Sequence, residues 1–361
     1  MKILFWVPYP SEGPSNRYRV EQYLPYLRNN GIRYSLRNFW SKSAYKILYK
    51  KGYFLIKTFF FIRGTMLRIL DVLCIFRYDL VFIHREAYPV GGFLFEMFLT
   101  LLKKPFIFDF DDAIFLPASS MPNNFVERFR NPDKIAKIIK RARHVIAGNS
   151  YLADFALRFN KSVRVIPTPI DTENYYPLTK VTAEKVTIGW MGSATTLSFV
   201  YMMEGVFRRL SEKFSNLEFM VVGGRFYLPG LNNISSKPWN YGEEKDTLAA
   251  FDIGIMPMSN NVWTRGKCGF KAILYMSSGI PCVCSAVGMN KEIIVDGING
   301  YLADTEDEWA EKLSLLIDSQ QLREKIGAAG RRTVEEKYSV QVNAPKFIEI
   351  LIGGRNVNCD S

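Results

Sequence analysis

Short runs of β-branched and aromatic residues alternate with longer helix-compatible stretches in two successive series along the chain. Parallel strands need a crossover segment between them, so this alternation predicts βαβ units and a mainly parallel sheet in each series. The expected strands of the first series are residues 2–7, 33–39, 80–84, 105–110, 144–147 and 163–166. Those of the second series are residues 186–190, 217–222, 253–256, 281–285 and 301–303.

A proline-rich segment separates the two series. Residues 167–177 contain three prolines and little apolar pattern, which is typical of a linker. A length of 361 residues suits two domains, each with its own core. We therefore expect an N-terminal domain over residues 1–166, a C-terminal domain over residues 167–337, and a helix over residues 338–352 that packs back on the first domain.

The net charge of +12 is concentrated near the N-terminus. Residues 1–70 hold thirteen Lys or Arg against two acids, and within residues 41–70 seven cations are interleaved with seven aromatic residues and no acid. This composition favours the surface of an anionic bilayer as a partner. Two alternatives remain: a nucleic acid, and a solvated basic face above a buried aromatic one. We expect no nucleic-acid partner.

Several classes of protein lose support from the sequence. No stretch approaches the roughly 20 apolar residues of a membrane-spanning helix, and the apolar run that ends at Pro8 is too short for a signal peptide. The five cysteines have no metal-ligand spacing and fit reduced thiols, which predicts a cytoplasmic location. Neither G-x-G-x-x-G nor the P-loop motif is present, so a dehydrogenase or a P-loop kinase is disfavoured.

The densest functional signal is the run WTRGKCGFK at residues 263–271, directly before a helix-compatible stretch. It brings Arg265, Lys267 and Lys271 together with two glycines, and a helix N-terminus adds backbone N–H groups and a positive dipole end. These groups predict a site for a diphosphate, the alternative being a solvated cationic turn. Gly192 and Ser193, after the first strand of the second series, are expected to bring backbone N–H groups to the same diphosphate. A tight turn without ligand is the alternative there.

Five runs in the C-terminal half form a specific combination: DIGIMP at 252–257, KCGFK at 267–271, YM at 275–276, GIPCV at 279–283 and EIIVDGINGYL at 292–302. Together they resemble the donor-binding half of family 4, or group 1, glycosyltransferases of the GT-B fold. The N-terminal half is similar more weakly, through SNRYR at 15–19, the Asp111–Asp112 pair, GNS at 148–150 and IPTPID at 166–171.

This resemblance implies an α/β fold of two Rossmann-like βαβ domains facing across a cleft, with a C-terminal helix returning to the first. The implied activity is sugar transfer from a nucleotide-diphosphate donor, with retention of anomeric configuration and without a bound metal or cofactor. Lys267 and Lys271 are then the catalytic candidates, because cations stabilise charge on a leaving diphosphate. The expected donor contacts are Gly192, Ser193, Arg265, Gly269, Phe270 and Glu292, with helix capping as the alternative for Glu292.

The same resemblance places acceptor chemistry in the first domain. Asp111 and Asp112 stand where the family often has a histidine followed by an acid, and a carboxylate there can orient an acceptor hydroxyl or accept its proton. Residues 109–111 also match a D-x-D metal signature, and capping is a third possibility. The expected acceptor contacts are Arg17, Arg19, Arg85 and Asp109, with an Arg85–aspartate ion pair as an equal alternative. His144 is expected to be non-catalytic.

The chain departs from the family at one important place. Many members carry two glutamates eight positions apart around the donor helix, and the matching positions here are Gly266 and Leu274. The missing carboxylates keep two other hypotheses open: a non-catalytic nucleotide- or phosphate-binding protein on the same fold, and a sugar-nucleotide epimerase. We favour a transferase that extends a membrane-associated glycan or lipid-linked acceptor in envelope polysaccharide or lipopolysaccharide biosynthesis. We expect it to be cytoplasmic and bound peripherally to the inner face of the cell membrane.

Overall fold

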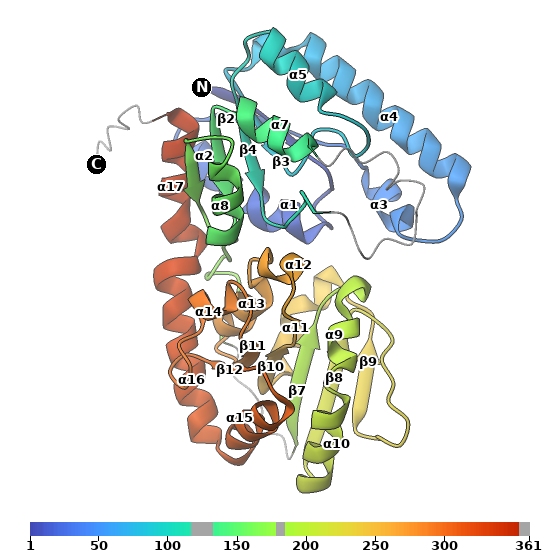
Figure 1. Ribbon diagram of the computed structural model, residues 1–361, viewed down its shortest axis with the longest axis vertical. Coiled ribbons are helices and arrows are strands. Elements are labelled where there is room, and N and C mark those ends of the chain that lie inside the picture. Colours follow the sequence, from blue (N-terminus) through green and yellow to red (C-terminus); the bar gives the residue numbers. More distant parts are fainter. Residues whose placement is uncertain (117–132, 178–184, 354–361) are drawn as a thin grey trace. The chain divides into compact units, whose positions relative to one another are not determined.

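The computed structural model describes residues 1–116, 133–177 and 185–353 of the chain. The chain divides into two compact units (Figure 1): Met1–Pro169 together with Asn343–Ser361, and Ile170–Val342. Each unit contains one six-stranded sheet of parallel strands flanked by helices. Within the described ranges no helix combines the length and the hydropathy needed to cross a membrane.

The sheet of the first unit has the strand order β2-β1-β3-β4-β5-β6. Its strands are β1 (Lys2–Val7), β2 (Arg33–Asn38), β3 (Leu80–His84), β4 (Phe106–Phe110), β5 (His144–Ala147) and β6 (Val163–Val165). Its helices are α1 (Pro14–Arg19), α2 (Leu24–Asn29), α3 (Lys42–Leu48), α4 (Phe54–Leu73), α5 (Leu94–Leu101), α7 (Lys134–Arg141) and α8 (Ser150–Leu157). Every residue of β3 and β4 is buried, as expected of central parallel strands covered on both faces.

The sheet of the second unit has the order β12-β11-β10-β7-β8-β9. Its strands are β7 (Val186–Met191), β8 (Leu217–Val222), β9 (Ile234–Lys237), β10 (Ile253–Met256), β11 (Cys282–Ser285) and β12 (Tyr301–Ala303). Its helices are α9 (Ser198–Tyr201), α10 (Glu204–Lys213), α11 (Glu244–Ala249), α12 (Val262–Arg265), α13 (Phe270–Ser277), α14 (Asn290–Ile293), α15 (Glu306–Asp318) and α16 (Gln320–Thr333).

All eleven strands expected from the sequence are present, with ends shifted by at most one residue. The sequence analysis missed β9, whose four residues ISSK carry a single apolar side chain. This strand lies at the edge of its sheet, where one side has no strand neighbour and burial is only partial. Backbone pairing with β8 therefore forms β9 without the apolar pattern on which strand prediction depends.

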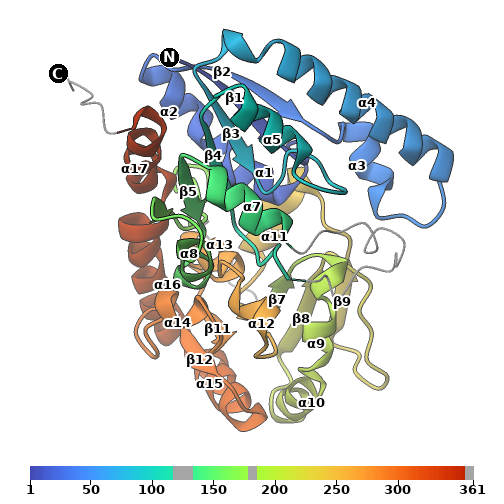
Figure 2. The same cartoon turned by 45° about the horizontal axis from the view of Figure 1, so that its top comes forward.

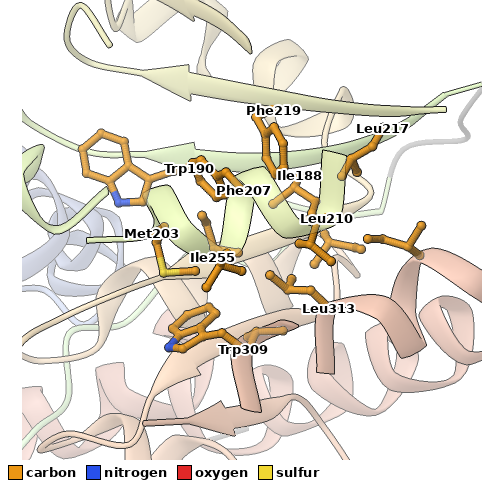
Figure 3. Packing of buried hydrophobic residues seen from close by; sticks show 14 of the residues in the cluster. Ile188, Trp190, Met203, Phe207, Leu210, Leu217, Phe219, Ile255, Trp309 and Leu313 are labelled. Atoms are coloured by element: carbon orange, nitrogen blue, oxygen red, sulfur yellow. The ribbon is translucent and has the colours of Figure 1, made fainter. Parts of the chain in front are cut away.

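Alternate residues of β7 face opposite sides of the second sheet. On one side Ile188 and Trp190 join a large apolar core with residues of β8, β10, α10 and α15 (Figure 3). On the other side a Cβ at Gly189 would lie within 2.2 Å of the Phe251 ring, so only glycine fits there. Gly254 on β10 is similarly covered by the Tyr275 ring of α13. Gly189 thus makes room for Phe251, and Gly254 lets α13 pack closely against β10.

The last helix, α17 (Val340–Ile352), runs into the first unit, and its residues from Asn343 onward pack there. Phe347 is buried and stacks on Tyr23, with ring centroids 4.2 Å apart, and meets the edge of Phe82 at 5.3 Å. The return of the C-terminal helix to the first domain, expected from the resemblance, is confirmed.

We predict that Phe347→Ala lowers the free energy of unfolding of the first unit by about 3–5 kcal/mol, the usual cost of deleting a buried aromatic side chain. Urea unfolding followed by circular dichroism measures the change. Leu315→Ala, at an exposed position of α15, is the matched control and should change stability by no more than about 0.5 kcal/mol. Equal effects of the two substitutions would contradict the packing role of α17.

Candidate functional site

Polar side chains gather at the carboxyl ends of β1, β3 and β4 in the first unit. Gly13 and Pro14 begin α1 just after β1 and place Ser15 in its first turn. The Ser15 Oγ lies 2.5 Å from Nε2 of His84, the last residue of β3, and donates a hydrogen bond to Oδ2 of Asp111 at 3.0 Å. The other ring nitrogen of His84, Nδ1, lies 2.6 Å from Oδ2 of Asp109. Hydrogen bonds thus link Ser15, which follows β1, to His84 at the end of β3 and to the aspartates at the end of β4.

Arg19 and Asp109 form the buried base of this network. Their side chains are 1% and 0% exposed, and the Arg19 guanidinium pairs with both carboxylate oxygens of Asp109. Arg19 also donates to the carbonyl of Ile166 at 2.6 Å. This burial leaves no surface on either side chain for an acceptor, which corrects their expected role as acceptor contacts. They hold His84 and the end of β4 in place.

Arg85 and the two following aspartates form the outer part of the network. Arg85 adopts a left-handed backbone with φ 61°, which turns its guanidinium so that Nε donates to Asp111 at 2.7 Å and Nη2 lies 4.0 Å from Asp112. Burial alone would raise the pKa of Asp111, but the charges of Arg85 and Arg19 and the Arg85 hydrogen bond hold it well below its usual range. Asp111 is therefore ionised at neutral pH and acts as a hydrogen-bond acceptor.

The side chains of Asp112 and Arg85 are 23% and 22% exposed, whereas that of Asp111 is 10% exposed. Asp112 also accepts a hydrogen bond from the backbone N–H of the next residue, Ala113, within a bend, and its capping role stays a prediction. Asp109 and Asp111 each face a guanidinium, an arrangement that disfavours a D-x-D metal site. Arg17 is buried and lies 4.7 Å from the Tyr18 ring centroid.

In the second unit, Lys271 of α13 lies beside the end of β7. Its Nζ is 5.6 Å from the Trp190 ring centroid, and its Cε would be 2.9 Å from a Cβ placed at Gly192. The hydroxyl of Tyr275 accepts from the N–H of Met191 at 3.0 Å and donates to the carbonyl of Ile255 at 3.3 Å. These bonds, made from the second turn of α13, fix the helix against β7 and β10 and hold Lys271 of its first turn next to Gly192.

The three cations of the predicted diphosphate site occupy different surroundings. Burial, and after it the nearby charge of Lys267, lower the pKa of Lys271 to about 8. Lys267 lies over the Trp263 ring, with Nζ 3.7 Å from the centroid. Arg265 is exposed, and its Nε donates to Oδ1 of Asn260 at 3.0 Å. Lys267 and Lys271 are therefore electrostatically coupled, whereas Arg265 is turned toward Asn260.

Glycine conformation shapes the loops around these lysines. Gly269 begins α13 with φ 63°, and a Cβ there would lie 2.3 Å from Ile293. Gly223, after β8, has φ 112°, and its Cβ would overlap the carbonyl oxygen of Gly192 at 1.7 Å. The N–H of Gly192 donates to Val222 at 2.9 Å, so it is engaged in the sheet. This corrects the expectation that Gly192 offers its N–H to a diphosphate; the residue instead makes room for the Trp190 ring, 2.4 Å from a Cβ placed there, and for Lys271.

The remaining predicted donor contacts lie around α13 and α14. Ser193 shares a hydrogen bond of 2.7 Å with Thr195 at the exposed start of the loop after β7. Phe270 is the first residue of α13 and is partly buried. Glu292 is exposed in the first turn of α14, whose N-cap Met289 makes no side-chain cap. Leu274, at one of the two glutamate positions of the family, is buried.

The sequence analysis assigned no site role to four residues that organise these clusters: Ser15, His84, Trp190 and Tyr275. His84 carried a usable signal, because it is a polar residue that ends a predicted parallel strand beside Arg85. Trp190 gave only the apolar signal of a predicted strand, and Ser15 and Tyr275 entered only as members of the runs that resemble the family. The positions of Trp190 and Tyr275 beside Lys271 depend on the packing of α13 against β7, which no spacing in the sequence encodes.

The chain is similar in sequence to known proteins. Residues 185–319 match the profile of the family described as Glycosyl transferases group 1. The spore coat protein SA of Bacillus subtilis strain 168 is 31% identical over 78 residues, 21% of this chain and 21% of that protein. The capsular polysaccharide biosynthesis glycosyltransferase CapM of Staphylococcus aureus is 24% identical over 173 residues, 45% of each. The chain thus spans less than half the length of these curated relatives.

Solved structures match over nearly the whole chain. HepE from Anabaena, in complex with UDP and glucose, has a TM-score of 0.73 at 16% identity and covers 98% of this chain and 100% of its own. The sucrose-phosphate synthase of Thermosynechococcus elongatus has a TM-score of 0.68 at 13% identity and covers 98% of both chains. At these identities the likeness shows the fold.

We predict that Asp111→Asn lowers the free energy of unfolding of the first unit by about 2 kcal/mol at pH 7, because a charge-assisted hydrogen bond to Arg85 is lost. The pKa of Asp111 is lower in the folded than in the unfolded state, so its stabilising contribution is complete above the unfolded value of about 4 and is lost as the pH falls below it. Urea unfolding at pH 7, 5 and 3 measures this.

The control for this prediction is Asp154→Asn, at an exposed position of α8. It should leave stability unchanged at each pH. A stability difference between the wild type and Asp111→Asn that is as large at pH 3 as at pH 7 would contradict an ion pair at this position.

Proposed function

We propose that this chain, whose residues 185–319 belong to the group 1 glycosyl transferases and whose two sheets have the GT-B fold, transfers a sugar from a nucleotide-diphosphate donor. The observation that carries the proposal is the position of Lys271 beside Gly192 at the end of β7, within electrostatic reach of Lys267. Two coupled ammonium groups near a helix N-terminus suit a dianionic diphosphate better than a neutral ligand.

The lysine pair supplies the chemistry that the reaction needs. Negative charge builds on the leaving diphosphate as the glycosidic bond to the donor breaks, and cations fixed in advance stabilise it more than flexible solvent does. The charge of Lys267 lowers the pKa of Lys271 in the free protein, so an anion between the two lysines relieves their repulsion. We propose on this basis that transfer needs no metal and no resident cofactor. Retention of anomeric configuration is proposed from the family resemblance.

Uridine diphosphate is the first donor nucleotide to test, because HepE structures hold UDP and UDP-glucose. In this proposal Lys267 and Lys271 contact the diphosphate, and Ser193, Arg265, Gly269, Phe270 and Glu292 surround the donor. Gly192 contributes by leaving space for Lys271.

The acceptor side of the proposal uses the outer network of the first unit. Asp111 is an ionised acceptor of hydrogen bonds, and Asp112 and Arg85 are partly exposed. A carboxylate with an accessible oxygen orients an acceptor hydroxyl and lowers the cost of its deprotonation. We therefore propose that Asp112 and Arg85 contact the acceptor, with Asp111 holding Arg85. Arg17 remains a proposed acceptor contact through its position on α1.

We propose that the acceptor is a membrane-associated glycan or lipid-linked intermediate, in envelope polysaccharide assembly. CapM is named for capsular polysaccharide biosynthesis, which supports this class of acceptor. A cytoplasmic protein at the inner face of the cell membrane fits the four described cysteines, which are free thiols. The missing carboxylates at Gly266 and Leu274 favour one alternative, a nucleotide-binding protein without turnover.

A turnover assay separates the transferase from the nucleotide-binding protein without turnover. We predict that the purified protein slowly hydrolyses, or transfers from, at least one of UDP-glucose, UDP-galactose and UDP-N-acetylglucosamine in the presence of EDTA, as measured by release of UDP. If calorimetry shows that the protein binds UDP, but no nucleotide is released from any UDP, GDP, ADP or CMP sugar, the non-catalytic alternative is favoured. Conversion of one UDP-sugar to another without release of UDP would identify an epimerase.

We predict that Lys271→Ala and Lys267→Ala each lower kcat/KM by about 100-fold, the usual size for loss of one charge-stabilising donor. Lys291→Ala, at an exposed position of α14 in the same unit, is the matched control and should keep the wild-type rate. Near-wild-type rates in both site variants would refute the diphosphate assignment.

The pH dependence of UDP affinity gives an independent test. Lys271 has a pKa of about 8 in the free protein, so it is charged below that pH and neutral above it. The affinity for UDP should therefore fall as the pH rises from 7 to 9. The Lys271→Arg protein should lose this fall, because guanidinium stays charged throughout the range. Calorimetry at three pH values measures it, and equal pH slopes in the two proteins would contradict the role of Lys271.

A further inference from the structure

The helix α4 turns two of its charged residues, Arg68 and Asp71, inward and a row of apolar residues outward. Arg68 is fully buried and donates to the carbonyls of Ala87 at 3.0 Å and Val7 at 3.1 Å. It also pairs with the buried Asp71, which accepts a hydrogen bond from the Trp6 indole at 3.0 Å. The charges of Arg68 and Asp71 are therefore used inside the first unit.

The opposite side of α4 is an exposed apolar stripe. Successive members are four or three residues apart, so they share one face of the helix, and each is between 42% and 81% exposed. The members are Leu55, Phe59, Ile62, Met66, Ile69 and Leu73. The inward side packs so closely that a Cβ at Gly64 would lie 2.9 Å from Phe39. The helix therefore cannot rotate to bury its stripe without displacing this packing.

The exposed apolar surface continues onto α5. Leu94, Phe98 and Leu101 are exposed on this helix, four and three residues apart. Both views of the molecule show α5 running beside α4 within the first unit (Figures 1 and 2), and the two helices are in contact. We call the stripe of α4 together with these three residues the α4–α5 face. An apolar surface spread over two neighbouring helices marks an interaction site.

The charges around this face select its partner. Lys50 and Lys51 precede α4, Arg63 flanks the stripe, Arg77 follows the helix and Lys103 follows α5, and all five are exposed. Between residues 41 and 78 the sole acid is Asp71, which is buried. An apolar surface with a cationic border complements the hydrocarbon and the anionic headgroups of a bilayer. A second copy of the chain would instead oppose cation to cation.

We propose that the α4–α5 face inserts into the interfacial layer of an anionic bilayer, with α4 lying parallel to the membrane plane. The apolar stripe enters the boundary between headgroups and acyl chains, and the five cations contact lipid phosphates. Phe60 and Phe61 take no part, because they are partly buried against the cluster formed by Phe39 and Trp40. This inference goes beyond the proposed reaction, since lipid binding requires neither donor nor turnover.

Vesicle sedimentation of the full chain tests the proposal. The wild type should bind vesicles of phosphatidylglycerol and phosphatidylcholine more tightly than vesicles of phosphatidylcholine alone. The triple variant Leu55→Ser, Phe59→Ser, Ile62→Ser should bind the mixed vesicles at least tenfold more weakly, because three side chains lose their transfer to an apolar phase. These positions are exposed, so its thermal unfolding should match that of the wild type. Leu315→Ser, in the second unit, should bind as the wild type does.

A second variant separates charge from insertion. Lys50→Gln, Lys51→Gln, Arg63→Gln should weaken binding to the anionic vesicles and leave binding to the neutral vesicles unchanged. If the wild type binds neither kind of vesicle, or the serine variant binds as the wild type does, the proposal is wrong. If the wild type is a dimer by light scattering and the serine variant is a monomer, the face is a contact between copies and the proposal is equally wrong.

Cys74, exposed just after α4, reports insertion directly. In a Cys359→Ser background, an environment-sensitive fluorophore on Cys74 should shift to shorter wavelength when anionic vesicles are added, while Cys268, Cys282 and Cys284 are buried and stay unlabelled. The same fluorophore on Arg209→Cys of α10, in the Cys74→Ser protein, should show no shift. Equal shifts at both positions would overturn the proposed orientation.

The failure of this inference is distinguishable from the failure of the proposed reaction. Vesicle binding without sugar-nucleotide turnover would refute the transferase and leave the membrane proposal standing. Turnover without vesicle binding would refute the membrane proposal and leave the transferase standing.

Discussion

The burial of parallel strands on both faces is the constraint from which the rest of the structure follows. Because each strand returns to the same end of its sheet through a crossover, all carboxyl ends within a unit meet at one edge. Side chains from β1, β3 and β4 thereby form one network in the first unit, and those that follow β7 and β10 surround one lysine in the second. Both candidate clusters occupy the edge where polar side chains can leave a covered sheet.

Two buried ion pairs help to fix the packing of the first unit. Arg19 with Asp109, and Arg68 with Asp71, are held inside and saturated by further bonds to backbone carbonyls, His84 or Trp6. Removing either partner of such a pair would leave an uncompensated charge, which costs more than the pair itself contributes. The same pairing explains why Asp111, with a guanidinium beside it, stays ionised while lying close to other carboxylates.

The helix α4 has buried charges on one side and an exposed apolar stripe on the other. Its inward face carries Arg68 and Asp71 because the ends of β1 and β2 present backbone carbonyls that need donors. Arg68 and Asp71 make their contacts on the inward face, and the apolar stripe on the opposite side of the helix faces outward. The pattern that would normally bury a helix in a core here leaves an apolar face bordered by cations. The basic and aromatic composition of residues 41–70 is thus divided between aromatic rings packed inside and a surface suited to lipid.

The sequence alone determined which segments form strands and that these fall into two series, because both depend on local apolar runs and turn residues. It also singled out Lys267, Lys271 and Gly192 as donor contacts, which stay predictions, and it indicated the return of the last helix. Tertiary structure decided which side chains reach the surface. It buried Arg19 and Asp109, engaged the N–H of Gly192 with Val222, and brought His84 to Ser15, since contacts between residues far apart in sequence depend on strand order and packing.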